Sequence, residues 1–201
     1  MLAILPKVEQ SQLYNTWNTK LPAYDSANET VVSANVEVYL CPSHIVPGEP
    51  YRTTFLGQTT SWAYASYVGN LGSNFIVDYQ DWGPAAQPDG VLYRQSKVRP
   101  ADISDGTSLT LMAGERVHRD MLLSPLWGFG YTGRVVGDAS AEIQKPNDWK
   151  VHWSFSSFHP GGAHFLMADG SVGMLSLDTD TAIFRGLSTR AGLEAEIERP
   201  F

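Results

Sequence analysis

The chain has 201 residues, of which 43% are hydrophobic and 17% are charged. This length and composition fit one folded globular domain and exclude an intrinsically disordered chain. With 14 basic against 21 acidic residues and a formal net charge of −7, the chain would repel a phosphate backbone, so we expect no nucleic acid partner.

The aromatic and turn-forming residues indicate the fold class. Six Trp, nine Tyr and eight Phe occur beside 18 Gly and 12 Pro; aromatic residues favour strands, whereas Gly and Pro interrupt helices. We therefore expect an α+β, β-dominated fold. It should form a single domain over 1–201, partly helical in 1–35 and rich in strands and long loops in 36–201.

The N-terminal segment predicts a short helix and no membrane span. The opening run MLAILP is far shorter than the roughly 20 apolar residues that cross a bilayer, and no basic segment precedes it. In residues 6–18, Val8, Leu13 and Trp17 recur at helical spacing behind a proline suited to a first helical turn.

The next segment predicts a second helix followed by a strand. In residues 26–35, Ser26 followed three residues later by Glu29 matches a capping box. Residues 36–43, VEVYLCPS, alternate in the manner of a strand and end at a proline and a serine.

Strands dominate the middle of the chain. Residues 60–72 alternate aromatic and small side chains, 90–98 resemble another strand, and 108–117 have the β-branched and apolar content of a buried strand. Residues 78–90 are rich in Asp, Pro and Gly and predict a long surface loop.

A C-terminal β-hairpin is predicted over residues 163–175, AHFLMADGSVGML. Two apolar runs are joined there by Asp169 and Gly170. An Asp-Gly pair is typical of a two-residue turn in which both central residues adopt positive φ. The preceding HPGG sequence fits a loop.

Three histidines raise the question of a metal site. His152, His159 and His164 fall within 13 positions, and neutral imidazole is a common zinc ligand. Their spacing matches no ligand motif such as HExxH. Structural histidines are therefore favoured, with His164 in the core because it directly enters an apolar strand, and no firm metal site is assigned.

The nucleophile and acid candidates also favour structural roles. The single cysteine, Cys41, excludes a disulfide within the chain and is expected to be a buried thiol. Glu115, at the end of a predicted strand, is the most conspicuous carboxylate. No second carboxylate lies at a sequence spacing that would indicate an acid–base pair. We therefore expect Glu115 to pair with Arg116 or a loop N–H. We assign no catalytic residue and expect no enzymatic activity.

Calcium is a weak alternative on ligand chemistry alone, and no cofactor is assigned. Two loops offer carboxylate oxygens, which suit hard cations: Asp102 and Asp105 in DISDGTS, and Asp178 and Asp180 in SLDTDT. Neither loop has the EF-hand pattern, and both are explained equally well as turns with Asx-type hydrogen bonds.

Four aromatic residues are candidates for ligand binding. Trp62, Tyr64 and Tyr67 alternate with small residues, and Trp82 lies in the predicted loop. Exposed, they would stack on sugar rings or on side chains of a partner. The alternative for the first three is the core face of a sheet, and Trp82 is the better candidate for exposure.

A family resemblance extends over most of the chain. His159, nine intervening residues and Asp169-Gly170, in FHPGGAHFLMADGSVGML, resemble the C-terminal signature of the pilin-like proteins with an H-x9-DG motif, domain of unknown function 1559, abundant in planctomycete bacteria. The stretches LPKVEQSQLYN, VYLCPS, YVGN and ADISDGTSLTLMAGE are similar to that family in the same order.

The resemblance implies a cell-surface or secreted protein with a pilin-like or pseudopilin-like globular body. Its precursor would carry a cleavable leader and a long apolar N-terminal helix; this chain begins about where the body would, with that helix absent. The implied role is structural, through protein partners or self-assembly, in an extracellular assembly or a secretion-related pseudopilus. A carbohydrate-binding module and a metallohydrolase built on the three histidines stay open as alternatives.

The motif residues carry one geometric expectation. Because an extended strand rises about 3.3 Å per residue, His159 and Asp169 should lie at opposite ends of a strand and should not touch. We expect His159 to bond instead to main chain or to a neighbouring loop.

Overall fold

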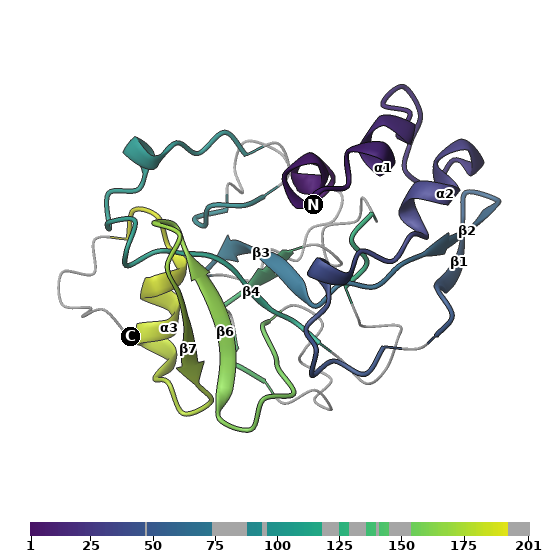
Figure 1. Cartoon of the computed structure of the whole chain (residues 1–201). Helices are drawn as coiled ribbons and strands as arrows, with labels where there is room; N and C mark the ends of the chain where they lie inside the picture. Colours follow the sequence, from purple (N-terminus) through teal and green to yellow (C-terminus); the bar gives the residue numbers. More distant parts are fainter. Residues whose placement is uncertain are drawn as a thin grey trace.

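The computed structural model describes residues 1–46, 48–73, 88–93, 96–117, 125–128, 136–139, 141–144 and 154–192. A five-stranded sheet in the order β5-β3-β4-β6-β7 forms the centre of the molecule (Figure 1). All its neighbouring strands are antiparallel except the parallel pair β3 and β5. Its strands are β3 Tyr67–Gly72, β4 Leu111–Glu115, β5 Val136–Asp138, β6 Gly162–Met167 and β7 Val172–Ser176.

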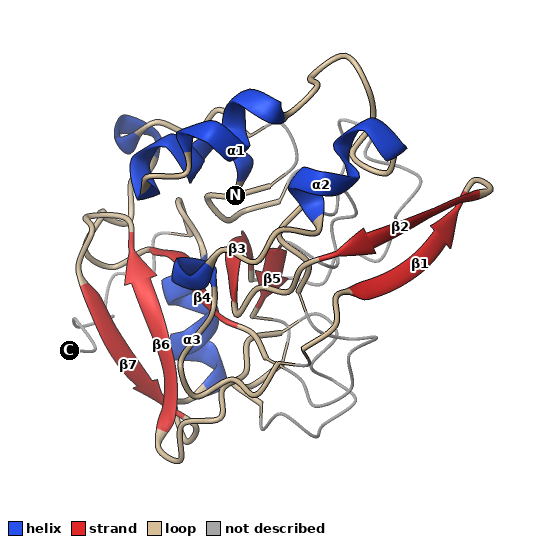
Figure 2. Cartoon of the chain, turned by 45° about the vertical axis from the view of Figure 1, so that its right-hand side comes forward, coloured by secondary structure: helices blue, strands red, loops and turns tan. Residues whose placement is uncertain are grey.

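Short helices and a separate hairpin precede this sheet. Figure 2 shows the β1–β2 hairpin extending away from the larger sheet. These elements are the 3-10 helix η1 Leu2–Val8, α1 Ser11–Thr16, the 3-10 helix η2 Ser26–Asn28, α2 Glu29–Val32, the 3-10 helix η3 Glu37–Tyr39, β1 Tyr51–Phe55 and β2 Gln58–Trp62. Later come the 3-10 helix η4 Pro100–Asp102 and the helix α3 Thr181–Ser188.

The α+β, β-rich fold class is therefore confirmed, as is the C-terminal hairpin, which β6 and β7 form. None of the helices that the structure describes combines the length and the apolar character needed to cross a bilayer.

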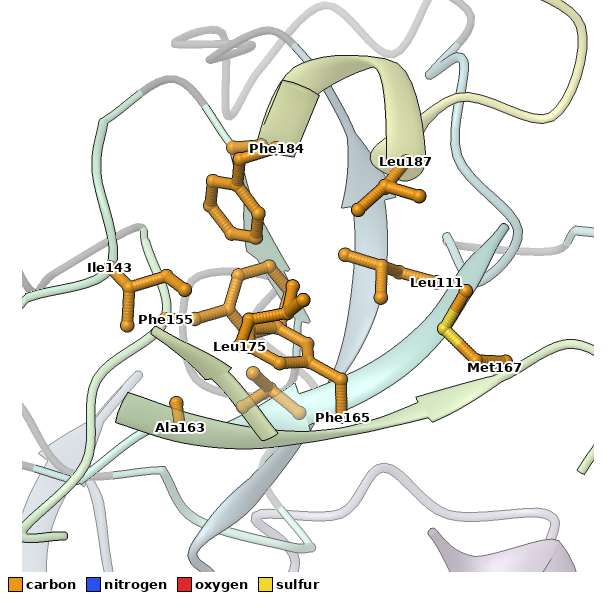
Figure 3. Packing of buried hydrophobic residues seen from close by; sticks show 11 residues of the cluster. Leu111, Ile143, Phe155, Ala163, Phe165, Met167, Leu175, Phe184 and Leu187 are labelled. Atoms are coloured by element: carbon orange, nitrogen blue, oxygen red, sulfur yellow. The ribbon is translucent and has the colours of Figure 1, made fainter. Parts of the chain in front are cut away.

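The main core lies between one face of the sheet and α3 (Figure 3). Side chains alternate between the two faces of a strand, so Ala163, Phe165 and Met167 of β6 all point to this face. Phe184 and Leu187 of α3 pack onto them. Asp180 caps the start of the helix, and its carboxylate accepts hydrogen bonds from the Ala182 and Ile183 N–H groups.

The predicted helices form with different boundaries. The helix expected over 6–18 is divided into η1 and α1, because Glu9 between them adopts a left-handed conformation with φ 61°. The capping box expected from Ser26 and Glu29 is wrong. Asp25 is the capping residue and accepts from the Ala27 N–H, while the Glu29 carboxylate accepts from the backbone N–H of Ser61 in β2.

The strand predicted over 36–43 is wrong, because this segment contains η3 and a loop. Val36 and Tyr39 are both buried in the same cluster. Residues three apart lie on one side of a 3-10 helix but on opposite faces of a strand. Burying both side chains together therefore favours the helical turn.

Two further strand predictions need correction. Residues 60–72 are not continuous: β2 and β3 belong to different sheets, and between them the Ala63 and Ala65 N–H groups donate to the carbonyls of Val32 and Pro125. The strand predicted over 90–98 does not form in the part of this range that the structure describes.

The β6–β7 turn is longer than the predicted two-residue turn. The Gly170 N–H donates to the Met167 carbonyl, and Leu166 pairs with Val172. Only Gly170 has positive φ, at 91°. Asp169 instead uses its Oδ1 atom to accept hydrogen bonds from the N–H and hydroxyl of Ser171, which stabilises the turn without a positive φ at Asp169.

We expect Gly170→Val to lower the free energy of unfolding by about 1 kcal/mol or more, because a β-branched residue tolerates positive φ poorly. No atom lies within 4 Å of the Cβ position, so the loss reports backbone strain alone. Asp169→Asn is the matched control, since an amide oxygen still accepts from Ser171. Urea unfolding checks both variants; equal losses would contradict the assignment of the strain to Gly170.

Candidate functional site

The second face of the sheet, opposite α3, carries a different set of side chains. Met112 of β4 and His164 and Leu166 of β6 alternate with the core residues of their strands, so they point away from α3. Val172 of β7 pairs with Leu166 across the hairpin. These residues line a cavity of about 1300 Å³, which we call the groove.

The other side of the groove comes from the N-terminal region. Met1, Ile4 and Val8 of the first helical segment line it, together with Val38 and Tyr39 of η3. Several of the lining apolar side chains are exposed: Ile4 by 48%, Val38 by 58% and Val172 by 65%. The groove is therefore apolar and reaches the molecular surface.

A buried carboxylate lies at the polar end of the groove. Glu115 ends β4 and is only 1% exposed. Its Oε2 atom accepts hydrogen bonds from the Ser157 hydroxyl at 2.9 Å and from the His164 N–H at 2.7 Å. These two donors fix the carboxylate plane and leave Oε1 directed at another neighbour.

That neighbour is His159, whose ring also contacts Cys41. The His159 Nε2 atom lies 3.3 Å from Glu115 Oε1 and 3.5 Å from Cys41 Sγ. Both contacts are therefore made to the same ring nitrogen. In a Cys–His–acid relay the acid would instead contact the second ring nitrogen and orient the imidazole. Cys41 and Glu115 therefore both approach Nε2 of His159, and the three side chains do not form a relay.

His164 lies beside this cluster but not in the core, so its predicted core position is wrong. Its side chain is 43% exposed, and Nδ1 lies 3.4 Å from Glu115 Oε2. The His159 and His164 rings meet edge to face with centroids 4.8 Å apart. Only the backbone of His164 follows the prediction, since it belongs to β6.

The thiol in this cluster is not activated. Burial, and more weakly the neighbouring Glu115, raise the pKa of the Cys41 thiol against the opposing effect of hydrogen bonds with Ser43. Burial also raises the pKa of the nearby Tyr67 to about 12. Both groups are therefore protonated at neutral pH, and a reactive cysteine would need the opposite shift.

The candidate aromatic residues do not form one exposed face. Trp62 and Tyr64 are 1% and 5% exposed and pack with Val32 and Leu126 in a core cluster, so they cannot stack on a ligand. Tyr67 is half-buried and lines the groove. Trp82, like His152, lies outside the described residues.

The carboxylates of Asp102, Asp105 and Asp180, three of the four candidate calcium residues, have structural partners. Asp102 forms an ion pair with Arg99, which lowers the pKa of the Asp102 carboxyl to about 2. Asp105 accepts hydrogen bonds from the Thr189 hydroxyl and the Gly192 N–H. Asp180 caps α3, and Asp178 lies in the preceding turn. Calcium binding stays a prediction.

The family-motif residues His159 and Asp169 lie at opposite ends of β6 and make different contacts. His159 precedes β6 and its ring contacts Cys41 and Glu115, whereas Asp169 follows β6 and stabilises the turn. Cys41 lies in a neighbouring loop, as expected for a partner of His159. The contact between His159 and Glu115 was not predicted, because each candidate residue was compared only with its neighbours in the chain.

Comparison with known proteins identifies one match. The family described as "Protein of unknown function (DUF1559)" matches residues 1–182. No curated protein matches the chain, and no solved structure matches it.

Proposed function

Because the chain belongs to the DUF1559 family, we propose that it is a non-enzymatic, extracytoplasmic, pilin-like interaction protein whose groove holds an apolar helix of a protein partner. The observation that carries this proposal is the groove itself, a largely apolar cavity between the second face of the sheet and the N-terminal region.

The size and the lining of the groove support a polypeptide occupant. Small-molecule pockets usually measure about 300–1000 Å³, and the groove is larger, at about 1300 Å³. Its apolar rim, which includes Ile4, Val38 and Val172, is exposed. Covering such side chains with an apolar helix face would contribute roughly 25 cal/mol for each Å² removed from water.

A non-enzymatic role is supported by the chemistry of Cys41, Glu115 and His159, which we call the polar cluster. Cys41 and Glu115 approach the same nitrogen of His159, and burial raises the pKa of the Cys41 thiol. Neither this geometry nor the raised pKa makes the Cys41 thiol a stronger nucleophile. A carbohydrate-binding role has weaker support, because the burial of Trp62 and Tyr64 removes two of its four candidate residues.

The test uses a fluorescently labelled synthetic peptide that forms an amphipathic helix with an aliphatic face. We expect saturable binding to the full chain and at least a tenfold weaker affinity for Val172→Glu, because the complex would bury an unpaired charge. Ile183→Glu is the matched control: Ile183 is 45% exposed but lies on α3. Absence of saturable binding, or equal losses in both variants, would contradict the proposal.

A further inference from the structure

We propose that Cys41, Glu115 and His159 form a binding site for one Zn²⁺ ion at the polar end of the groove. Among the described residues, these three are the one group of His, Cys, Asp and Glu side chains whose ligand atoms all lie within 4.8 Å of one another. His164, the other histidine candidate that the structure describes, is not among these three ligands.

The two distances that His159 makes to the other ligand atoms match tetrahedral coordination, and the Cys41 and Glu115 ligand atoms lie within 4.8 Å of each other. With Zn–S of about 2.3 Å and Zn–N and Zn–O of about 2.05 Å, tetrahedral sulfur and nitrogen ligands lie about 3.6 Å apart, and nitrogen and oxygen ligands about 3.3 Å apart. The observed separations are 3.5 Å between Cys41 Sγ and His159 Nε2, and 3.3 Å between His159 Nε2 and Glu115 Oε1.

The charge of the ligand set also fits a divalent ion. On binding, the Cys41 thiol releases its proton to solvent and coordinates as a thiolate. One thiolate and one carboxylate then balance the two positive charges, and His159 adds a neutral nitrogen. This neutral complex suits the site, because Cys41 and Glu115 are 4% and 1% exposed and an unbalanced charge there would be costly.

The mixture of donors selects the metal. A sulfur, a nitrogen and an oxygen ligand suit Zn²⁺, whereas Ca²⁺ and Mg²⁺ require oxygen ligands throughout. The fourth tetrahedral position is left for a water molecule or for a donor atom of the groove's occupant.

Neighbouring groups hold the carboxylate in a ligating position. Ser157 Oγ and the His164 N–H donate to Oε2 of Glu115, so Oε1 is left to face His159 at 3.3 Å. The Ser157 hydroxyl also accepts from the His159 N–H at 3.1 Å. Such hydrogen bonds around the ligands are typical of metal sites. The ion would join three chain segments: the loop after η3, the end of β4 and the loop before β6.

The experiment uses the full chain without a histidine tag. After chelator treatment and its removal, Co²⁺ is titrated as a spectroscopic probe and Zn²⁺ is then added in competition. We expect one Co²⁺ per chain, tetrahedral d–d absorption, and a thiolate-to-cobalt charge-transfer band that Zn²⁺ abolishes. At a Zn²⁺ concentration of about 100 Kd, the Tm should rise by about 5 °C or more.

Three variants separate ligation from folding. Cys41→Ser should lose the charge-transfer band, and Glu115→Gln should bind Co²⁺ at least about 100-fold more weakly, since loss of even a supporting group costs 10–100-fold. His164→Gln is the matched control, because its backbone N–H still supports Glu115, and it should keep the band. Absence of stoichiometric binding by the unaltered chain, retention of the band in Cys41→Ser, or its loss in His164→Gln would overturn the three-ligand site.

Discussion

Phe155→Ala is expected to lower the free energy of unfolding by about 3–5 kcal/mol, the range typical of a large aromatic residue removed from a core. Phe155 is fully buried, and its ring meets Phe165 at 5.0 Å and Phe184 at 5.9 Å between centroids, both edge to face. The substitution removes buried apolar area, opens a cavity and removes the ring contacts of Phe155 with Phe165 of β6 and Phe184 of α3 (Figure 3).

Urea unfolding of Phe155→Ala measures this loss, with Phe55→Ala as the control. Phe55 is 43% exposed and makes an aromatic contact with Tyr24. Its removal should therefore cost about 1 kcal/mol or less. A similar loss in both variants would contradict the central position of Phe155 in the core.

Gly72→Ala should be the second severe change, at about 2–5 kcal/mol from backbone strain and steric overlap together. Gly72 has φ 134°, a conformation that L side chains rarely adopt. An added Cβ atom would also overlap Asp89 Oδ1 and lie 2.6 Å from the Gly90 backbone nitrogen. The Asp89 carboxylate cannot move away without losing its hydrogen bonds from the N–H and hydroxyl of Ser73.

Gly57→Ala separates these two contributions. Gly57 also has positive φ, at 81°, but no atom lies within 4 Å of its Cβ position, so this variant should lose only about 1 kcal/mol through strain. Chemical unfolding of the two variants side by side gives the steric part as the difference. No difference between them would contradict the close approach of Gly72 to the segment at Asp89 and Gly90.

The parts of the fold that follow local rules could be predicted from the sequence. The β6–β7 hairpin has two apolar runs around an Asp-Gly pair, and β4 has a buried apolar run, so both formed near their expected positions. In residues 36–43, local alternation was overridden by the joint burial of Val36 and Tyr39. In residues 60–72, the backbone leaves the strand between Trp62 and Tyr67 to bond with distant segments.

The polar cluster illustrates the limit of sequence reasoning more sharply. Glu115, His159 and Cys41 were each recognised as conspicuous, and each was judged against its own neighbours in the chain. Their contacts depend on tertiary structure: 118 positions separate Cys41 from His159. The available signal was that Cys41 and Glu115 each stand at the end of an apolar run and His159 in a loop, where side chains from different segments can meet.

The order of strands in the sheet also determines when the sheet can be completed during synthesis. β4 pairs with β3, which precedes it, and with β6, which begins only at Gly162. Until β6 leaves the ribosome, one edge of β4 has no strand beside it, and the apolar face that later meets α3 is uncovered. Unpaired edges and exposed apolar faces promote aggregation of nascent chains. The free edge of β4 and the uncovered apolar face are therefore the parts of the partly synthesised chain that are most exposed to aggregation.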